Sequence, residues 1–229
     1  MIDWHCHILP GMDDGSRSVS ESLSLLNMQA DQGIATVIAT PHFYANDEGV
    51  ESFIERREKA FQTLKESLGD SAPRIILGAE VRYYRGISRL PALKELRIEG
   101  SNNLLIEMPE IKWSEDMIRE LIEMASMSKV RIVRAHIDRY YKLQSPKTWK
   151  RLYESGIKMQ VNASFFNSIY TKRKALRLLK NGRVHFVGSD CHNVTTRMPK
   201  IGKAYFMIRR RFGEGFLKQM NEYGYSKLV

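Results

Sequence analysis

The chain lacks several features that mark disulfide-rich, membrane-spanning or secreted proteins. Only two of its 229 residues are cysteine, which excludes a disulfide framework and favours a reducing compartment. No apolar run approaches the roughly 20 residues of a membrane-spanning helix. The first residues lack the basic and apolar segments of a secretory signal. We therefore expect a cytoplasmic protein, not integral to the membrane, in one domain covering residues 1–229.

Acidic residues are scarce in the last quarter of the chain. Residues 172–229 contain 14 Lys or Arg against 3 Asp or Glu, although the net charge of the whole chain is only +10. A basic segment can attract phosphate-bearing substrates, nucleic acid or anionic membrane, but it is also typical of a solvated helix surface. The sequence has no helix-turn-helix, zinc-finger or RNA-binding signature, so we expect no specific nucleic-acid partner.

Short apolar runs of strand length alternate with amphipathic stretches along the whole chain. Predicted strands cover residues 1–5, 34–40, 74–80, 104–108, 131–136, 157–162 and 184–189. Predicted helices cover residues 18–32, 53–68, 115–127, 146–154, 168–180 and 200–211. This alternation predicts an α/β fold with a mostly parallel sheet, and seven units without a linker favour a closed or nearly closed barrel.

Imidazole and carboxyl groups stand at or just after the ends of these predicted strands. The candidate metal ligands are His5, His7, Asp14, His42, Glu80, Glu107, His136, Asp190 and His192. Because the carboxyl ends of the strands in a parallel barrel open on one face, these distant side chains can meet there. Imidazole nitrogen and carboxylate oxygen bind divalent ions such as manganese, iron and zinc. Nine such groups suggest a hydrolytic centre with two or three metals.

Each candidate taken alone has a plainer interpretation. A single histidine such as His42 or His136 is more often a structural residue with a satisfied hydrogen bond. Glu80 and Glu107 lie inside apolar runs, where an unpaired carboxylate is costly and needs a cation or a proton. That cation could be Arg82 or Arg134 rather than a metal. The joint pattern across the strands is what favours the metal centre.

Six motifs in order give the chain a family resemblance. They are residues 3–15 (DWHCHILPGMDDG), 39–42 (ATPH), 78–81 (GAEV), 105–109 (LIEMP), 135–140 (AHIDRY) and 188–194 (GSDCHNV). With these motifs the chain resembles the polymerase-and-histidinol-phosphatase (PHP) superfamily. More narrowly it resembles the manganese-dependent protein tyrosine phosphatases of bacterial capsule and exopolysaccharide operons. It departs from that pattern at Trp4, Cys6 and Cys191, and at Asp138, where related chains usually carry Glu.

The resemblance implies a fold, a cofactor and a substrate. The fold would be a distorted (β/α)7 TIM-like barrel with three divalent ions, manganese being expected and iron, cobalt or zinc compatible. One ion would take His5, His7, Glu80 and Asp190, the second Glu80, Glu107 and His136, and the third Asp14, His42 and His192. The substrate would be phosphotyrosine on the tail of a membrane-associated bacterial tyrosine kinase. The oligomeric state stays open.

Such a centre would hydrolyse phosphate monoesters with a metal-activated hydroxide as nucleophile. Arg139 and Arg197 are our candidates for binding the phosphoryl group, since a guanidinium donates to two phosphate oxygens at once. Either arginine could instead form a structural ion pair. Tyr83, Tyr84, Tyr140 and Tyr141 could border the mouth and stack on a substrate ring, or lie half-buried in its wall.

Four other functions compete with this interpretation. Cys191 and Arg197 match the Cys-x5-Arg pattern of cysteine-based phosphatases, although the loop between them lacks glycine. A small ester such as histidinol phosphate could use the same metals, provided that a spare acidic group binds its amine. A nuclease or nucleic-acid-binding protein would use the basic last quarter. A non-catalytic interaction module would have no need to retain so many potential ligands.

Overall fold

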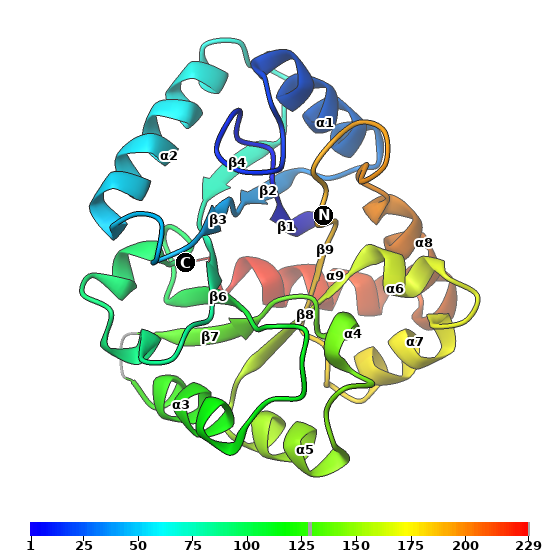
Figure 1. Ribbon diagram of the computed structural model, residues 1–229. Helices are drawn as coiled ribbons and strands as arrows, with labels where there is room; N and C mark the ends of the chain where they lie inside the picture. Colours follow the sequence, from blue (N-terminus) through cyan, green and yellow to red (C-terminus); the bar gives the residue numbers. More distant parts are fainter. Residues whose placement is uncertain (128–129, 229) are drawn as a thin grey trace.

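The computed structural model describes residues 1–127 and 130–228, in which helices surround a curled sheet of parallel strands (Figure 1). The strands are β1 (Ile2–Cys6), β2 (Thr36–Ala39), β3 (His42–Phe43), β4 (Arg74–Leu77), β5 (Glu80–Arg82), β6 (Asn103–Glu107), β7 (Arg131–Arg134), β8 (Lys158–Asn162) and β9 (Phe186–Gly188). The α-helices are α1 (Val19–Asp31), α2 (Val50–Lys65), α3 (Glu115–Ala125), α4 (Ile137–Tyr140), α5 (Pro146–Glu154), α6 (Ala163–Asn167), α7 (Lys172–Lys180), α8 (Ile201–Phe212) and α9 (Glu214–Tyr225). Short 3-10 turns cover Ile87–Arg89 and Leu93–Leu96.

The strands pair in parallel throughout. One ladder has the order β1-β2-β4, and the other has the order β3-β5-β6-β7-β8-β9. The chain passes from the first ladder to the second twice, through residues 40–41 between β2 and β3 and residues 78–79 between β4 and β5. A bridge between Cys6 and Cys191 joins the end of β1 to the segment after β9. The carboxyl ends of the strands therefore lie on the same side of a curled sheet.

The predicted elements agree with most of this structure. Each predicted strand overlaps a strand, or a pair of strands interrupted by two residues. Helix α2 begins at Val50, earlier than predicted, and α7 begins at Lys172, later than predicted. Helix α9 and the short helices α4 and α6 were not predicted. None of the described helices combines the length and hydrophobicity needed to cross a bilayer.

The inside of the curled sheet is filled by apolar side chains below the carboxyl ends of the strands. This interior cluster contains Ile2, Trp4, Ile38, Ile76, Ile98, Leu105, Val133, Ala135 and Phe186. Trp4 stacks on Phe186 with ring centroids 3.8 Å apart. Helix α9, which lies behind the sheet in Figure 1, closes the cluster with Tyr223. Its Gly224 lies so close that an added Cβ would be 3.1 Å from Ile2 and 3.2 Å from Trp4.

An irregularity in β1 turns two consecutive side chains toward the interior. The pairing of β1 with β2 shifts register between Asp3 and Cys6. Trp4 therefore packs in the interior cluster, and the next residue, His5, contacts carboxylates at the upper end of the interior. Cys6 packs outward with the residues that α1 buries. The irregularity thus places the apolar side chain of Trp4 in the interior cluster and the polar side chain of His5 directly above it.

Candidate metal centre

Glu80, at the start of β5, is the hub of a buried polar cluster. Its Oε2 atom lies 3.0 Å from Nε2 of His5, 3.3 Å from Nε2 of His7 and 3.2 Å from Nδ1 of His42. Its Oε1 atom lies 2.8 Å from Nε2 of His136. The Glu80 side chain is only 1% exposed. One carboxylate therefore touches four imidazoles from three separate segments of the chain.

Asp190 and Glu107 complete the walls of the cluster. Oδ1 of Asp190 lies 3.8 Å from Nε2 of His5 and 3.6 Å from Nε2 of His7. Oε1 of Glu107 lies 3.4 Å from Nε2 of His136. The β6 strand presents Glu107, and the loop after β9 presents Asp190. These carboxylates lie on either side of the Glu80 hub.

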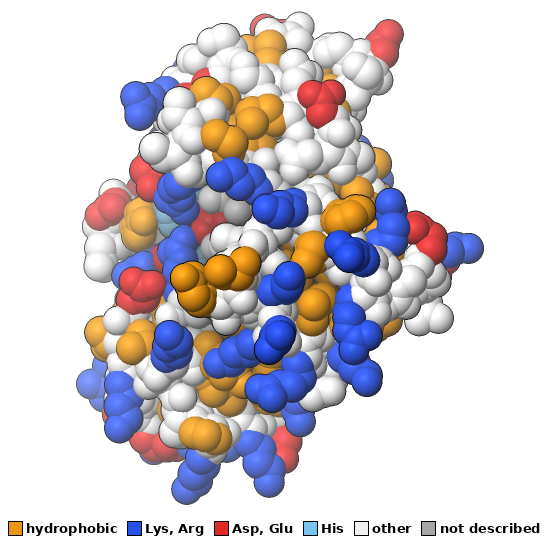
Figure 2. All heavy atoms as spheres, turned by 90° about the vertical axis from the view of Figure 1, so that its right-hand side faces the viewer, with side chains coloured by type: hydrophobic (Ala, Val, Ile, Leu, Met, Phe, Trp, Pro, Cys, Tyr) orange, Lys and Arg blue, Asp and Glu red, His pale blue; other side chains and the backbone are white. Residues whose placement is uncertain are grey.

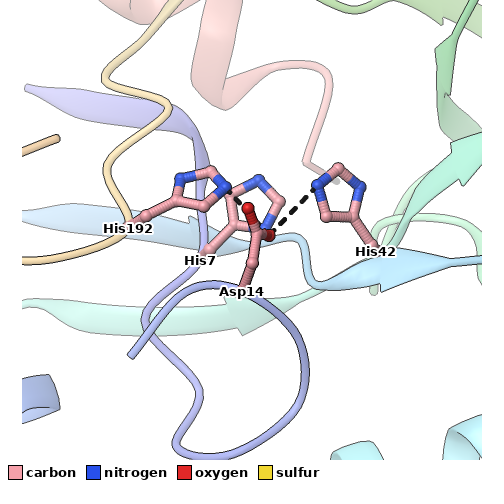
Figure 3. A group of neighbouring side chains, drawn as sticks. All are labelled: His7, Asp14, His42 and His192. Carbon is pink, nitrogen blue, oxygen red and sulfur yellow. Dashed lines mark ion pairs between the residues drawn. The ribbon is translucent and has the colours of Figure 1, made fainter. Parts of the chain in front are cut away.

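Asp14 bridges two histidines at the outer edge of the cluster. Its Oδ1 atom lies 3.3 Å from Nε2 of His192 and 3.6 Å from Nε2 of His42, as the dashed lines in Figure 3 mark. His7 lies behind this group, and its ring centroid is 3.9 Å from that of His192. Asp14 is 63% exposed, whereas His192 is 1% exposed. The outer group is therefore open to solvent at Asp14 and, to a smaller extent, at His42, which is 12% exposed.

The structure thus brings all nine predicted ligands together. Among the described residues, three groupings have potential ligand atoms within 4.8 Å of one another: His7, Asp14, His42 and His192; His5, His7 and Asp190; and His42, Glu80 and Glu107. These groupings overlap the sets implied by the family resemblance but differ in detail. His7 also joins the outer group, and His42 also approaches Glu80 and Glu107.

Two of the converging residues have a strained backbone. His136 has φ of 29° and Asp190 has φ of 54°, values that residues other than glycine rarely adopt. Both follow the end of a strand, where this turn redirects the side chain toward the Glu80 hub. Such strain persists where the surroundings hold it, and it is concentrated at functional sites.

Buried groups behind the cluster fix the orientation of its histidines. Asp13 accepts from Nδ1 of His7 at 2.7 Å and from the backbone N–H of His42 at 2.8 Å. Oε1 of Gln160 accepts from the backbone N–H of His136 at 2.5 Å and lies 3.3 Å from Nδ1 of His5. Neither Asp13 nor Gln160 was predicted as a site residue. Polar partners of this kind set which imidazole nitrogen faces the centre.

The electrostatics of the cluster favour ionised carboxylates. Burial alone would raise the pKa of Glu80, but the charge of His5 and the hydrogen bond to His136 hold that pKa well below its usual value. Burial would lower the pKa of His7, yet Asp13 and Glu80 raise it well above the usual value. Burial and the charge of His7 lower the pKa of His192 to about 4. His192 is therefore neutral near pH 7, with a lone pair available.

The donor set fits divalent metal ions. Nδ1 of His42 and Nε2 of His192 are buried without a hydrogen-bond partner, although each lies within 3.3 Å of a carboxylate oxygen. An unpaired buried nitrogen beside an ionised oxygen is costly, and a cation between them would satisfy both. Five imidazoles and four carboxylates give the mixed nitrogen and oxygen surroundings that suit manganese, iron or zinc.

Both predicted phosphate-binding arginines lie beside Asp190. Nη2 of Arg139 lies 2.5 Å from Oδ2 of Asp190, and Nη2 of Arg197 lies 3.0 Å from its Oδ1. Arg139 also approaches Glu107 at 3.6 Å, and Arg197 approaches Asp14 at 3.4 Å. Both arginines line a cavity of about 370 Å³ next to Asp190. They are partly exposed, so their donors can reach a group that enters this cavity.

The four tyrosines considered for the rim are all buried or partly buried, which is the alternative given for them from the sequence. Tyr140 is 1% exposed and packs on His136, and Tyr83 is buried with its hydroxyl donating to Glu120. Tyr44 instead stacks on His42 with ring centroids 5.3 Å apart. It is 38% exposed and lines a second cavity of about 250 Å³ with Asp14. No sequence pattern singles out Tyr44, because it is an isolated tyrosine two residues after His42.

The cysteine mechanism does not fit the structure. Cys191 is fully buried and packs in the outer core, where its sulfur is 3.9 Å from Nε2 of Gln29. Cys6, its neighbour across the bridge, is equally buried. Arg197 is held by Asp190 and Asp14 rather than by an anion-binding loop around Cys191. A thiolate of Cys191 therefore could not attack a substrate in the mouth.

One of the two alternative arginine partners does reach a candidate ligand. Nη1 of Arg82 donates to Oε2 of Glu107 at 2.6 Å, and the Arg82 side chain is 41% exposed. Arg134 is fully buried between the rings of Trp113 and Tyr140 and donates to the carbonyl of Ile106. Arg82 leaves the Oε1 atom of Glu107 facing His136. The ion pair with Arg82 therefore engages the Oε2 atom of Glu107, and the Oε1 atom still faces the metal centre.

Comparisons with known proteins agree with this geometry. Residues 1–228 match the family described as capsular polysaccharide synthesis, CpsB/CapC. Tyrosine-protein phosphatase YwqE of Bacillus subtilis is 31% identical, with 93% of this chain and 85% of the relative covered. Tyrosine-protein phosphatase CpsB of Streptococcus pneumoniae is 32% identical, with 96% and 94% covered.

Solved structures share the fold. One, described as YwqE from Bacillus subtilis and CpsB from Streptococcus pneumoniae, metal-dependent tyrosine phosphatases, matches with a TM-score of 0.82 and 27% identity over 100% of this chain and 94% of that chain. The histidinol phosphate phosphatase of Lactococcus lactis matches with a TM-score of 0.57 and 14% identity, over 92% of this chain and 93% of that chain. At that identity the second match shows a similar fold only.

Proposed function

Because the chain belongs to the CpsB/CapC family of capsular polysaccharide synthesis proteins, we propose that it is a metal-dependent tyrosine-protein phosphatase. The observation that carries the proposal is the convergence of imidazoles and carboxylates around Glu80. Relatives that align over nearly the whole chain are named tyrosine-protein phosphatases. The reaction is the hydrolysis of phosphotyrosine on a protein.

The proposed architecture is one domain, residues 1–229, built as a distorted (β/α)7 barrel. In this description β2 and β3 count as one interrupted strand, and so do β4 and β5. The bridge between Cys6 and Cys191 would close the barrel between β1 and β9. The two strand interruptions, at residues 40–41 and 78–79, support the proposed metal site, because His42 and Glu80 follow directly after them.

Three divalent ions are proposed, with manganese as the expected ion. The first would be held by His5, His7, Glu80 and Asp190, the second by Glu80, Glu107 and His136, and the third by Asp14, His42 and His192. The proximity of the members of each set supports this assignment. When bound, such ions polarise phosphoryl oxygens and lower the pKa of water toward neutrality.

The protein's own side chains would bind and orient the phosphoryl group. Arg139 and Arg197 would exchange their contacts with Asp190 for phosphate oxygens, since metal ions would then neutralise that carboxylate. Asn162 donates to Oδ2 of Asp190 at 2.7 Å and would hold the carboxylate in place during this exchange. The Tyr44 ring would lie beside the substrate ring at the mouth.

The proposed protein substrate is a phosphotyrosine-bearing segment of a membrane-associated bacterial tyrosine kinase. An extended or disordered tail suits this mouth, because Asp14 and Tyr44 leave it open to solvent. The phosphoryl group would enter between the arginines and the metal centre. Since a leaving phenolate needs little protonation, no separate buried acid is required at this position.

The test is metal analysis combined with hydrolysis of a phosphotyrosyl peptide. We expect the purified protein to contain transition metal, to lose activity in EDTA and to regain it with manganese. A Cys191→Ser variant should retain most of the activity. Full activity without bound metal would refute the proposal. Faster turnover of histidinol phosphate than of the peptide would keep the metal centre but change the substrate.

A further inference from the structure

A long stretch of the chain carries positive charge with almost no compensation. From Ser155 to Gly213 there are thirteen Lys or Arg and one acidic residue, Asp190. Asp190 pairs with Arg139 and Arg197 at the metal centre, so it offers no partner to the cations of α7 and α8. This stretch contains β8 and β9 together with α6, α7 and α8, and these three helices lie together on one side of the sheet (Figure 1).

Helix α7 begins with charges that oppose its own dipole. Lys172, Arg173 and Lys174 occupy its first turn, which contains no acidic residue, and Thr171 gives no side-chain cap. The positive end of a helix dipole favours acidic groups, so three cations there are unfavourable for folding. Arg173, Arg177 and Lys180 are exposed along one stripe of the helix and have no carboxylate partner among the described residues. Sequences that break local rules commonly do so for function.

The turn that joins α6 to α7 projects two apolar side chains into solvent. Ile169 is 75% exposed and Tyr170 is 90% exposed. The turn is held by backbone and side-chain hydrogen bonds, from the N–H of Lys172 to the carbonyl of Ser168 and from Oγ1 of Thr171 to the carbonyl of Phe165. These apolar side chains are therefore presented by an ordered turn.

Helix α8 continues this surface. Lys203, Phe206 and Arg210 are exposed at helical spacing on one side of α8, and Phe206 is 56% exposed. Asn167 at the end of α6 donates to the carbonyl of Lys200, just before α8, at 3.0 Å. Figure 2 shows Lys and Arg side chains spread over this side of the molecule, with hydrophobic side chains between them. We call it the basic face, formed by Ile169, Tyr170, Arg173, Arg177, Lys180, Lys203, Phe206 and Arg210.

We propose that the basic face docks the protein on the surface of an anionic lipid bilayer. Unpaired cations attract acidic headgroups, while Ile169, Tyr170 and Phe206 enter the boundary between headgroups and acyl chains. A fluid bilayer accepts projecting side chains without a shaped pocket. A protein partner would need matching cavities, and a nucleic acid would gain little from an exposed isoleucine. Charge complementarity therefore favours the membrane.

Docking by this face would bring the mouth of the metal centre near the bilayer. Lys200, which accepts the hydrogen bond from Asn167, lines the cavity that contains Arg139 and Arg197. The projecting turn thus lies on the same side of the molecule as the entrance for a phosphoryl group. This proposal depends on the surface alone and would stand if the substrate of the metal centre proved to be different.

The experiment is co-sedimentation of the full-length, metal-loaded protein with vesicles. Vesicles of phosphatidylcholine with 30% phosphatidylglycerol are compared with vesicles of phosphatidylcholine alone. We expect binding to the anionic vesicles only, and weaker binding at high salt. Replacing Arg173, Arg177 and Lys203 by Gln should weaken binding by about a hundredfold. Replacing Lys59, Lys65 and Arg74 by Gln removes equal charge from exposed positions in α2 and β4, away from α6, α7 and α8 (Figure 1), and should leave binding unchanged.

The apolar side chains have a separate test. Ile169→Ser combined with Tyr170→Ser should reduce binding at constant charge, and a Tyr170→Trp variant should shift its fluorescence to the blue with anionic vesicles only. Hydrolysis of a short phosphotyrosyl peptide should be unchanged in every variant, which verifies folding. Three outcomes overturn the proposal: no preference for anionic vesicles, binding of a DNA duplex in place of vesicles, or self-association that these substitutions abolish.

Discussion

Oδ2 of Asp13 lies 2.7 Å from Nδ1 of His7, and the same oxygen accepts the backbone N–H of His42. One buried carboxylate therefore orients two of the proposed metal ligands. It forces Nε2 of His7 toward Glu80 and Asp190. Although Asp13 lies beside Asp14 in the sequence, its side chain is only 5% exposed, whereas Asp14 is 63% exposed at the outer edge of the cluster.

Replacing Asp13 by Asn should weaken metal binding without unfolding the protein. The amide can still accept from His42, but it no longer holds the Nδ1 proton of His7 as strongly. Loss of such a supporting partner costs about 10–100-fold in metal affinity or activity. Competition with a fluorescent chelator measures the affinity. An Asp47→Asn variant is the control, since Asp47 lies at the rim of the neighbouring cavity. Equal affinities in the two variants would contradict the role of Asp13.

Arg139→Ala should separate catalysis from metal binding. Removing a donor aimed at the transferring group lowers turnover by about a hundredfold or more. Metal content, measured by elemental analysis, should stay at the level of the unchanged protein. Arg151→Ala removes an arginine whose ion pair, among the described residues, is with exposed Glu115, and it should have no effect. If Arg139→Ala lost its metal together with its activity, the arginine would be a support for Asp190 instead.

Gly188→Ala should disrupt the metal centre by displacing His5. A Cβ on Gly188 would lie 2.5 Å from Cβ of His5 and 2.9 Å from its backbone nitrogen, so β1 or β9 must move. We expect reduced metal content, low activity and a lower melting temperature. Gly215→Ala is the matched control, because an added Cβ there meets nothing within 4 Å. Normal activity of Gly188→Ala would show that His5 tolerates displacement.

His185 should make stability depend on pH, independently of the metal centre. Burial and nearby Lys158 lower its pKa to about 4, and its Nδ1 accepts the backbone N–H of Met159 at 3.1 Å. The unfolded chain, with a pKa near 6.5, binds a proton at pH 5 that the folded chain excludes. The folded state therefore loses about 2 kcal/mol between pH 7 and pH 5 through this group.

The check is urea denaturation of the unchanged protein and of a His185→Gln variant at both pH values. Glutamine can still accept from Met159 but has no proton to gain. The variant should be less sensitive to pH by the amount stated above. The metal centre contributes equally to both proteins, so their difference isolates His185. An identical pH dependence in the two proteins would assign the effect elsewhere.

The sequence predicted the strands and the converging residues because both follow from local patterns. Apolar runs mark buried strands, and a polar group directly after such a run lies at the carboxyl edge of a parallel sheet. His5, Glu80 and His136 were found in this way. Helix α9 was not predicted, because Gly215 and Gly224 interrupt its pattern and its role is to close the sheet against Ile2 and Trp4.

The parts that sequence patterns missed depend on distant contacts. Gln160 becomes a support only because β8 lies beside β7, which brings its amide to the backbone of His136. Tyr140 could have bordered the mouth or lain in its wall, and it is buried because the turn at His136 directs it between His136 and Arg134. Tyr44 reaches the rim only through its stacking on His42.

Helix α9 covers the interior cluster beneath Trp4 and Phe186, and this cover also affects the metal centre above the cluster. By keeping solvent out from below, Tyr223 and Gly224 lower the dielectric constant around His5 and Glu80 and so strengthen their attraction for cations. A lesion in this final helix would let water rise through the interior. The expected result is a lower affinity for metal ions at the carboxyl ends of the strands, on the other side of the interior.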